Sequence, residues 1–281
     1  MINFNGNITN EVNVISFKNR GFNYGDALFE TIKASHGKLL FWEDHYFRLM
    51  ASMRIMRMEI PMNFTMEYLE SQITNTLEAN KLYEASARVK LMVNRVEGGL
   101  YSPEKNAIEF LINVVSIDND FYLIDNSAYE VDLFKDYYIS PSLLSTLKTN
   151  NKVLNVVGSI YAKENKLQNC LILNTNKQVI EALNGNLFLV KDKIIKTPPI
   201  SDGCLKGIMR KQIIEIIGMM PEYTLEETSI SPFELQKADA LFITNVITGI
   251  QSITKYRKKN FTTTFANDLV KKLNIKIRLS N

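Results

Sequence analysis

Three groups with chemical potential follow one another between residues 145 and 210: a lysine, a glutamate and a glycine-led helix start. Lys148 ends an apolar approach that includes Leu143 and Leu144, and two asparagines follow it closely. A lysine brought into a cavity at the start of a loop loses solvation, which lowers its pKa and makes its amine a better nucleophile toward a carbonyl carbon. On position alone, Lys148 also fits the description of one more solvated surface lysine.

The glutamate and the helix start are ordinary features taken singly. Glu181 follows the short apolar run at 179–180 and precedes Asn184-Gly185-Asn186. This pattern alone is equally typical of a carboxylate at a turn that has no special function. Gly207 introduces a helix predicted over 207–218, where free amides and the helix dipole favour an anion. Every helix start offers that much. Arg48, on the polar side of a helix predicted over 43–58, would normally be solvated.

Together, these groups match what pyridoxal 5'-phosphate requires of a protein. That cofactor needs an amine for its aldehyde, a carboxylate near its pyridine nitrogen, an anion site for its phosphate and a side chain against its ring. Other chemistries have less support. No Gly-x-Gly-x-x-Gly precedes a helix, and neither Gly-x-x-x-x-Gly-Lys nor Gly-x-Ser-x-Gly occurs.

Composition sets the broad class of the protein. The chain has 281 residues, 46% of them hydrophobic and 22% charged, which is typical of a globular protein with a real core. The net charge is only +3, and the densest basic group, at 255–259, reads as a solvated turn, so no nucleic-acid partner is expected. Two histidines are too few for a histidine-rich metal site, and no metal is predicted.

The compartment is predicted to be the cytoplasm. Cys170 and Cys204 are too few for a disulfide framework. No basic segment followed by an apolar core opens the chain, and no stretch approaches 18 apolar residues, so neither a secretory signal nor a membrane span is expected.

Strand-like and helix-like segments alternate along the chain. Alternation of apolar and polar residues predicts a half-buried strand at 87–93, and Asn5-Gly6-Asn7 is a hairpin signal between the apolar runs 2–4 and 12–16. Further strands are predicted at 27–34, 38–41, 107–115, 129–134, 170–174, 178–181, 187–190, 193–197 and from 240, and further helices at 65–79, 151–166 and 263–274. Polar clusters at 118–120 and 125–127 indicate a linker at 121–128 between a small N-terminal domain, 1–120, and a larger C-terminal domain, 129–281.

The order of these motifs resembles that of the class IV aminotransferases, the fold-type IV pyridoxal-phosphate enzymes. This family includes branched-chain aminotransferases, D-amino acid aminotransferases and 4-amino-4-deoxychorismate lyases. The resemblance spans nearly the whole chain. It is carried by RGFNYGDALFETIK, HYFRL, LKTNN, VIEALNGNLF, TPP, LKGIMR and ALFITNVITGI, in that order.

The resemblance implies an α/β fold like that of D-amino acid aminotransferase. An α+β small domain would be followed by a larger pseudo-barrel domain that binds the cofactor. It also implies a homodimer with small-molecule substrates.

The same resemblance implies roles for single residues. Lys148 would carry the cofactor as a Schiff base and shuttle the proton between substrate and cofactor, and Glu181 would face the pyridinium nitrogen. Arg48 would bind the phosphate, assisted by the amides of Ile208 and Met209.

Further roles concern the ring and the substrate. Leu205 would pack on the ring, Tyr24 and Phe29 would line the substrate side, and Arg95 would stand where some members bind a substrate carboxylate.

The sequence departs from the family pattern in two places. Asn245-Val246-Ile247 stands where many aminotransferases have a threonine-rich turn that helps to hold the phosphate. Asn245 and Val246 are therefore expected at the cofactor, with Thr244, Thr248 or Lys152 compensating for the missing hydroxyl. In addition, the strand at 87–93 lacks the tyrosine and arginine of branched-chain enzymes and is more similar to the lyase and D-amino acid branches.

Three functions follow from this reading. The first is an aminotransferase that moves an amino group between an amino acid, branched-chain among the options, and a 2-oxo acid. The second is a lyase that makes 4-aminobenzoate and pyruvate. The third is a catalytically silent binding protein with the same fold, against which the intact Lys148 and Glu181 count.

Overall fold

The computed structural model describes residues 1–11 and 13–279, and these form two compact units. The first unit holds residues 1–120 together with 148–151, and the second holds 121–147 and 152–281. The sequence placed Lys148–Asn151 in the C-terminal domain. This segment groups with the first unit instead, because its backbone pairs with β3 (Ala27–Ser35).

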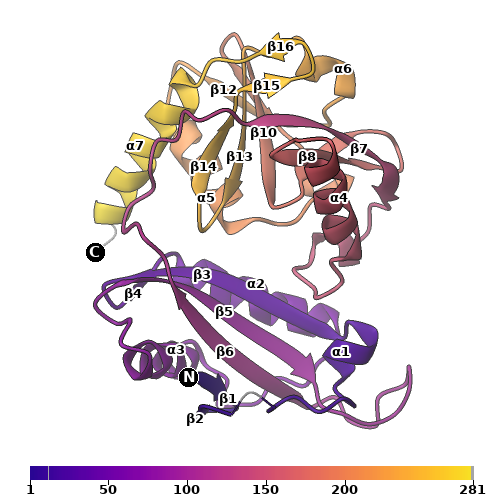
Figure 1. Ribbon diagram of the computed structural model, residues 1–281, viewed down its shortest axis with the longest axis vertical. Coiled ribbons are helices and arrows are strands. Elements are labelled where there is room, and N and C mark those ends of the chain that lie inside the picture. Colours follow the sequence, from indigo (N-terminus) through magenta and orange to yellow (C-terminus); the bar gives the residue numbers. More distant parts are fainter. Residues whose placement is uncertain (12, 280–281) are drawn as a thin grey trace. The chain divides into compact units, whose positions relative to one another are not determined.

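The first unit is one antiparallel sheet with helices packed on it (Figure 1). The strand order is β2-β1-β6-β5-β3-β4. Its elements besides β3 are β1 (Ile2–Phe4), β2 (Asn7–Thr9), α1 (Arg20–Tyr24), β4 (Lys38–Leu39), α2 (Trp42–Ile55), α3 (Met66–Ala79), β5 (Ser86–Arg95) and β6 (Ile108–Ser116).

Alternation along the strands creates the core of this unit. Leu28 and Ile32 in β3 lie opposite Val93 and Val89 in β5, so the four side chains share one face of the sheet. All four are at most 1% exposed, and α2 packs against β3 on the core side. The predicted strand at 87–93 is confirmed and extends to Ser86–Arg95.

The N-terminal hairpin forms at the predicted turn but with a shorter second strand. Asn5 and Gly6 have positive φ angles of 51° and 88°, as a two-residue hairpin turn requires. This turn sets Phe4 opposite Asn7, so Asn7–Thr9 is the pairing strand and the apolar run at 12–16 is not. Residue 12 lies outside the described residues.

The second unit is a large mixed sheet that branches at β10. The chain of neighbours is β12-β11-β10-β9-β8-β7-β15-β16, and β13 pairs with both β10 and β14. Its elements are β7 (Glu130–Ile139), η1 (Leu144–Thr146), α4 (Val153–Glu164), β8 (Asn169–Asn174), β9 (Val179–Ala182), β10 (Gly185–Lys191), β11 (Ile194–Thr197), η2 (Ile200–Asp202), α5 (Ile208–Gly218), β12 (Thr224–Glu227), α6 (Pro232–Leu235), β13 (Ala240–Asn245), β14 (Gly249–Ile253), β15 (Lys255–Tyr256), β16 (Lys259–Asn260) and α7 (Thr264–Leu279).

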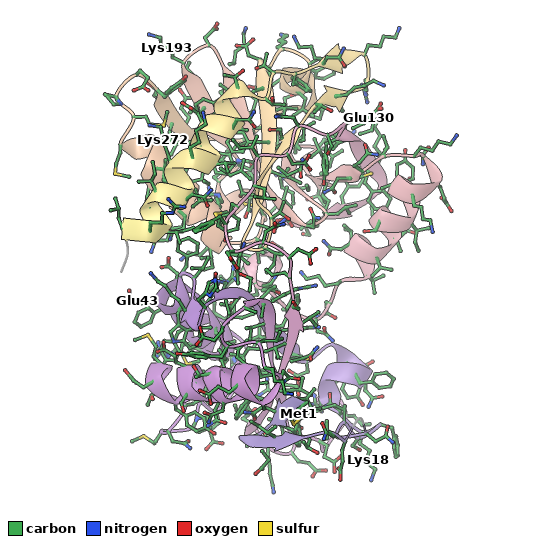
Figure 2. All side chains as sticks on the ribbon, turned by 60° about the vertical axis from the view of Figure 1, so that its left-hand side comes forward. Met1, Lys18, Glu43, Glu130, Lys193 and Lys272 are labelled. Atoms are coloured by element: carbon green, nitrogen blue, oxygen red, sulfur yellow. The ribbon has the colours of Figure 1, made fainter. Side chains whose placement is uncertain are left out.

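The branch at β10 gives this unit a continuous apolar interior. Leu187 and Leu189 on β10, Leu171 on β8 and Leu241 on β13 belong to one buried cluster. Charged side chains lie outside that cluster. Exposed lysines lie in several parts of the chain, among them Lys18, Lys193 in the turn between β10 and β11, and Lys272 on α7, all labelled in Figure 2.

Candidate active site

In the first unit, the segment that carries Lys148 adds a short stretch of pairing to the edge of β3. The Phe29 amide donates to the Lys148 carbonyl at 2.9 Å, and the Asn150 amide donates to the Ala27 carbonyl at 2.9 Å. This pairing fixes the position of the lysine backbone. The Lys148 ammonium lies 4.4 Å from the centre of the Phe29 ring, a cation–π distance. The structure thus brings Lys148 and Phe29 together.

Arg48 lies in a buried ionic cluster on the core side of the same sheet. Its Nε donates to Glu30 Oε1 at 2.8 Å, and its Nη2 forms a second, shorter bond to Glu30 Oε2. His45 Nδ1 lies 2.7 Å from the same Oε2. Burial alone would raise the pKa of Glu30, but the Arg48 charge and the His45 hydrogen bond outweigh it and hold that pKa at about 2. Arg48 is therefore not a solvated helix residue.

Glu30 and His45 were not among the site residues predicted from the sequence. The available signal was the glutamate itself, since Glu30 interrupts an otherwise apolar row between Leu28 and Ile32 on the core face of β3. An interrupted apolar row predicts a buried charge, which needs an ionic partner. HYFRL supplies that partner, because His45 and Arg48 are three residues apart on one helix face.

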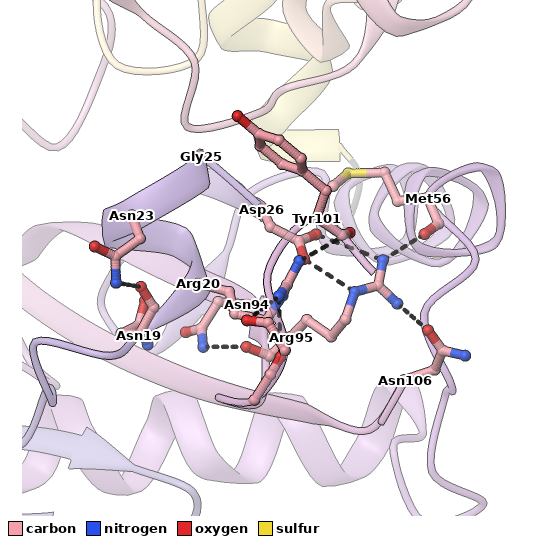
Figure 3. A network of polar contacts seen from close by, with 12 residues as sticks. Asn19, Arg20, Asn23, Gly25, Asp26, Met56, Asn94, Arg95, Tyr101 and Asn106 are labelled. Carbon is pink, nitrogen blue, oxygen red and sulfur yellow. Dashed lines mark hydrogen bonds and ion pairs between the residues drawn. The ribbon is translucent and has the colours of Figure 1, made fainter. Parts of the chain in front are cut away.

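Arg95, which the family resemblance places at a substrate carboxylate, lies in a network of polar contacts within the first unit (Figure 3). Its Nε and Nη2 both donate to Asp26, and Nη2 also donates to the Met56 carbonyl at 2.7 Å. Its Nη1 donates to the Arg57 carbonyl at 3.1 Å and to Asn106 Oδ1 at 2.6 Å. A guanidinium has five N–H groups, and these five bonds engage all of them. Arg95 therefore engages all of its donors with residues of the first unit, and the predicted binding of a substrate carboxylate by Arg95 would require some of these bonds to be exchanged.

Tyr24, at the end of α1, lies near a loop that a second arginine holds. The guanidinium of Arg20 lies 5.0 Å from the Tyr24 ring and donates to the carbonyls of Gly98 and Leu100. The rings of Tyr24 and Tyr101 are 5.7 Å apart. Tyr24 is 38% exposed, so it keeps a face available for a ligand.

In the second unit, three polar residues form a row across neighbouring strands. Glu181 on β9 lies opposite Asn186 on β10, which lies opposite Thr244 on β13. Directly opposite residues point to the same face of a sheet, so the three side chains are neighbours. Two of them hold the Leu205 backbone: its amide donates to Glu181 Oε2 at 2.9 Å, and its carbonyl accepts from Asn186 Nδ2 at 2.8 Å.

The start of α5 comes shortly after Leu205, whose backbone Glu181 and Asn186 hold. Gly207 precedes the helix and provides no side-chain cap, so the first amides, of Ile208 and Met209, have no intrahelical acceptor. A Cβ at Gly207 would stand 1.9 Å from Asn186 Oδ1, so only glycine allows this approach. Asn186 was not among the site residues predicted from the sequence. The signal that could have indicated it is its position in Asn184-Gly185-Asn186, a turn that follows Glu181.

The turn after β13 is built by its own polar atoms. Asn245 Oδ1 accepts from the amides of Ile247 and Thr248 at 3.0 and 2.9 Å, and the Val246 carbonyl accepts from the Tyr122 hydroxyl at 2.7 Å. Burial raises the pKa of the Tyr122 hydroxyl, which keeps it protonated as a donor. Asn245 thus shapes the turn.

The Thr244 hydroxyl is a buried polar group in this region without a hydrogen-bond partner among the described residues. Its Oγ1 is buried and has no hydrogen-bond partner among the described residues, and the residue is 2% exposed. A buried hydroxyl without a partner is uncommon in native proteins and fits a site that a ligand completes. Thr244 shares its row with Glu181, whose carboxylate suits a protonated ring nitrogen, and α5 offers amides to an anion. The residues present therefore fit a phosphorylated pyridine cofactor.

Residues 1–11 and 13–279 contain neither a cluster of metal ligands nor a helix that could span a membrane. No group of three or more histidine, cysteine, aspartate or glutamate residues in this part of the chain could hold a metal ion. Within the same residues, every helix is too short or too polar to cross a membrane.

Comparison with known proteins places these features in a family. Residues 27–256 match the family model described as amino-transferase class IV. A putative branched-chain-amino-acid aminotransferase of Methanocaldococcus jannaschii is 26% identical over 278 residues, covering 99% of this chain and 95% of the relative. An aminodeoxychorismate lyase of Vibrio harveyi is 26% identical over 239 residues, covering 84% of each.

Solved structures share the fold. The branched-chain amino acid aminotransferase of Thermobaculum terrenum, solved in its PLP form, superposes with a TM-score of 0.85 at 19% identity, covering 100% of this chain and 94% of that one. The expected α/β fold of type IV is thereby confirmed.

Proposed function

The chain belongs to the class IV aminotransferases, enzymes that depend on pyridoxal phosphate, and from this premise we propose that Lys148 carries the cofactor while the enzyme moves an amino group between an amino acid and a 2-oxo acid. When bound, the cofactor supplies an electron sink for the substrate's α carbon. The protein's own residues supply the anchoring, the electrostatics and the proton transfer.

The observation that carries this proposal is the polar row of Glu181, Asn186 and Thr244. Glu181 is fixed by the Leu205 amide, so its carboxylate is oriented, and in the proposed function it keeps the ring nitrogen protonated. Leu205, held on both sides of its peptide, is proposed to pack on the ring.

The phosphate is proposed to bind at the start of α5. The amides of Ile208 and Met209 supply hydrogen-bond donors. The Thr244 hydroxyl supplies a further donor, in place of the threonine-rich turn that this chain does not have. Arg48 is proposed to add the positive charge, and the turn of Asn245 and Val246 to line this end of the cofactor.

Lys148 is proposed to move the proton. Its amine lies 4.4 Å from the centre of the Phe29 ring, and this contact helps to orient the side chain. An unprotonated lysine amine held at the substrate's α carbon can accept that proton and return it at another atom. Phe29 and Tyr24 are proposed to line the substrate side.

Borohydride reduction tests the central assignment. The reduced wild-type protein is expected to retain the cofactor covalently at Lys148, located by peptide mass spectrometry. Lys148→Ala should lose both this label and turnover. Lys163→Ala, which changes an exposed lysine in the last turn of α4, should lose neither. A label on another residue, or wild-type turnover by Lys148→Ala, would show the assignment to be wrong.

The lyase is the second candidate function, for two reasons: the sequence of β5 and the presence of a lyase among the relatives. The strand at 87–93 lacks the tyrosine and arginine that the family resemblance leads one to expect in branched-chain enzymes, and an aminodeoxychorismate lyase is among the relatives. Pyruvate and 4-aminobenzoate released from aminodeoxychorismate without an amino acceptor would identify this reaction. Amination of a branched 2-oxo acid by glutamate would identify the transaminase, and failure of both with cofactor bound would favour a silent binding protein.

A homodimer is proposed from an exposed apolar face of the second unit. Val153, Val156 and Ile160 lie along one side of α4, and Leu143 and Leu144 precede the same helix in the chain; each is more than half exposed. Exposed apolar residues along one helix face are typical of an interface, and the family resemblance also implies a homodimer. Sedimentation velocity should show a dimer for the wild type and a monomer for Val156→Asp. Met62→Asp, at a fully exposed position of the first unit, should remain dimeric.

The domain boundaries and the compartment also remain proposals. We propose that domains 1–120 and 129–281 are joined at 121–128, so limited proteolysis should cut first in that linker. A cytoplasmic location is proposed because both cysteines are free, as is usual in a reducing compartment. Fractionation of cells would test it.

A further inference from the structure

Glu30 is a carboxylate in the apolar interior of the first unit. It is 2% exposed and stands on β3 between Leu28 and Ile32, which are at most 1% exposed. Two bonds join it to Arg48 and one joins it to His45, which is 0% exposed. The guanidinium is held along one edge, through Nε and Nη2, in the fork geometry that favours a fixed orientation.

The protonation states of this cluster follow from its geometry. The pKa of His45 is lowered by burial first, against its hydrogen bond to Glu30, so its ring is neutral and Nδ1 carries the proton donated to the carboxylate. Glu30 is ionised throughout the neutral range because its pKa is held at about 2. One negative and one positive charge therefore balance, with a neutral donor completing the carboxylate's coordination.

Stability alone does not explain such a cluster. A buried ion pair costs so much desolvation that apolar residues of similar volume usually serve stability as well or better. What the pair does provide is a guanidinium with a fixed direction. A long, flexible arginine that is already oriented loses less rotamer freedom when it binds a ligand.

We propose that Glu30 and His45 are positioning residues that hold Arg48 ready for the cofactor's phosphate. This inference rests on the proposed function, in which Arg48 meets that phosphate. Glu30 sets the plane of the guanidinium through its two oxygens. His45 fixes Glu30 in turn, so the two act through Arg48 and touch neither the cofactor nor the substrate.

The test compares a ligand with and without the phosphate. Pyridoxamine 5'-phosphate and pyridoxamine both bind without forming a bond to Lys148, so their dissociation constants from the apoenzyme can be measured by fluorescence titration. Glu30→Gln should weaken binding of the phosphorylated ligand about tenfold or more, the effect of losing one charged hydrogen bond, and change pyridoxamine binding by less than about twofold. Asp26→Asn removes another arginine-paired carboxylate of the same unit. It should leave unchanged the ratio of the pyridoxamine dissociation constant to the pyridoxamine 5'-phosphate dissociation constant, which falls whenever binding of the phosphate is lost.

Two further variants separate positioning from support of the fold. In an Arg48→Met background, Glu30→Gln should no longer affect the phosphorylated ligand and should raise the melting temperature, since the unpaired buried carboxylate is removed. His45→Asn, which retains a donor near Nδ1, should keep the wild-type ratio, whereas His45→Leu should lower it.

The outcomes discriminate between this inference and the function beneath it. If the wild type binds neither ligand, the proposed function fails; if Arg48→Met leaves the ratio unchanged, the phosphate role of Arg48 fails. If Arg48→Met lowers the ratio while Glu30→Gln and His45→Leu do not, the positioning inference is overturned. Should Glu30→Gln not fold, the pair His45→Leu and His45→Asn decides the question by the same ratio.

Discussion

Replacing Gly207 by alanine tests how the second unit shapes its anion site. Gly207 has φ −73° and ψ 137°, which alanine adopts without strain, so the backbone conformation carries no penalty. The added Cβ, however, would lie 1.9 Å from Asn186 Oδ1 and 3.1 Å from its Cγ. Asn186 is 3% exposed and tied to the Leu205 carbonyl, so it has to rotate and break that bond.

The magnitude follows from these contacts. Overpacking a well-packed interior costs about 1–3 kcal/mol, and a buried amide that loses its partner costs about 1–3 kcal/mol more. Because one movement of Asn186 relieves the first term while incurring the second, the two do not add fully. We expect Gly207→Ala to lower the free energy of unfolding by about 2–4 kcal/mol and to weaken pyridoxamine 5'-phosphate binding, since Leu205 and the first amides of α5 shift together.

Gly218→Ala is the matched control in the same helix. A Cβ at Gly218 meets nothing within 4 Å, and alanine is the better helix former by about 1 kcal/mol. This variant should be as stable as the wild type or slightly more stable, with unchanged ligand affinity. Urea unfolding followed by far-UV circular dichroism measures the first quantity, and fluorescence titration measures the second. If Gly207→Ala matched Gly218→Ala in both, the close approach of Gly207 to Asn186 would have no energetic importance.

Three more outcomes are expected. The wild type should be more stable than Glu30→Gln by roughly 3 kcal/mol above pH 4.5. This advantage should vanish as the pH falls from 4.5 toward 2, because the pKa of Glu30 in the folded protein lies below its ordinary value. A difference in urea unfolding that does not depend on pH would refute the ion pair. Arg95→Met should cost about 3–5 kcal/mol because it removes five hydrogen bonds at once, with Asp26 left paired to Arg20 alone. Arg95→Lys should not restore the loss in thermal unfolding, since one ammonium cannot replace the guanidinium fork. Cys170 and Cys204, whose pKa values burial raises to about 11 and about 12, should react with a thiol reagent at mildly alkaline pH only after unfolding; fast labelling of the native protein would contradict their burial.

Much of the fold could be predicted because its signals are local. Alternation along β5 and the spacing of apolar residues on α2 and α3 depend only on the repeat of a strand or a helix. The order of motifs around Lys148 and Glu181 gave the family for a similar reason, since each motif is a short continuous segment. Short elements such as β15 and β16, two residues each, carried no such repeat and were missed.

Partners of the charged residues could not be predicted, because they depend on how elements that are separate in the sequence pack against one another. Arg95 meets Asp26 across 69 positions, and Arg48 meets Glu30 across 18. Both arginines match ligand-binding residues of the family in the sequence. Only the tertiary structure shows that residues of this chain engage all five donors of Arg95 and that the buried Glu30 carboxylate holds Arg48.

The sequence by itself determined the family, the two-part organisation and the residue types that a phosphorylated pyridine cofactor needs. The tertiary structure alone decided which backbone those residues rest on: Lys148 pairs with β3 in the first unit, and Asn186 aligns Glu181 with Leu205 in the second. The physical reason is that residue types and their periodicity are properties of the chain. A hydrogen bond also requires two distant backbones to be held within about 3 Å, and only the folded packing provides that.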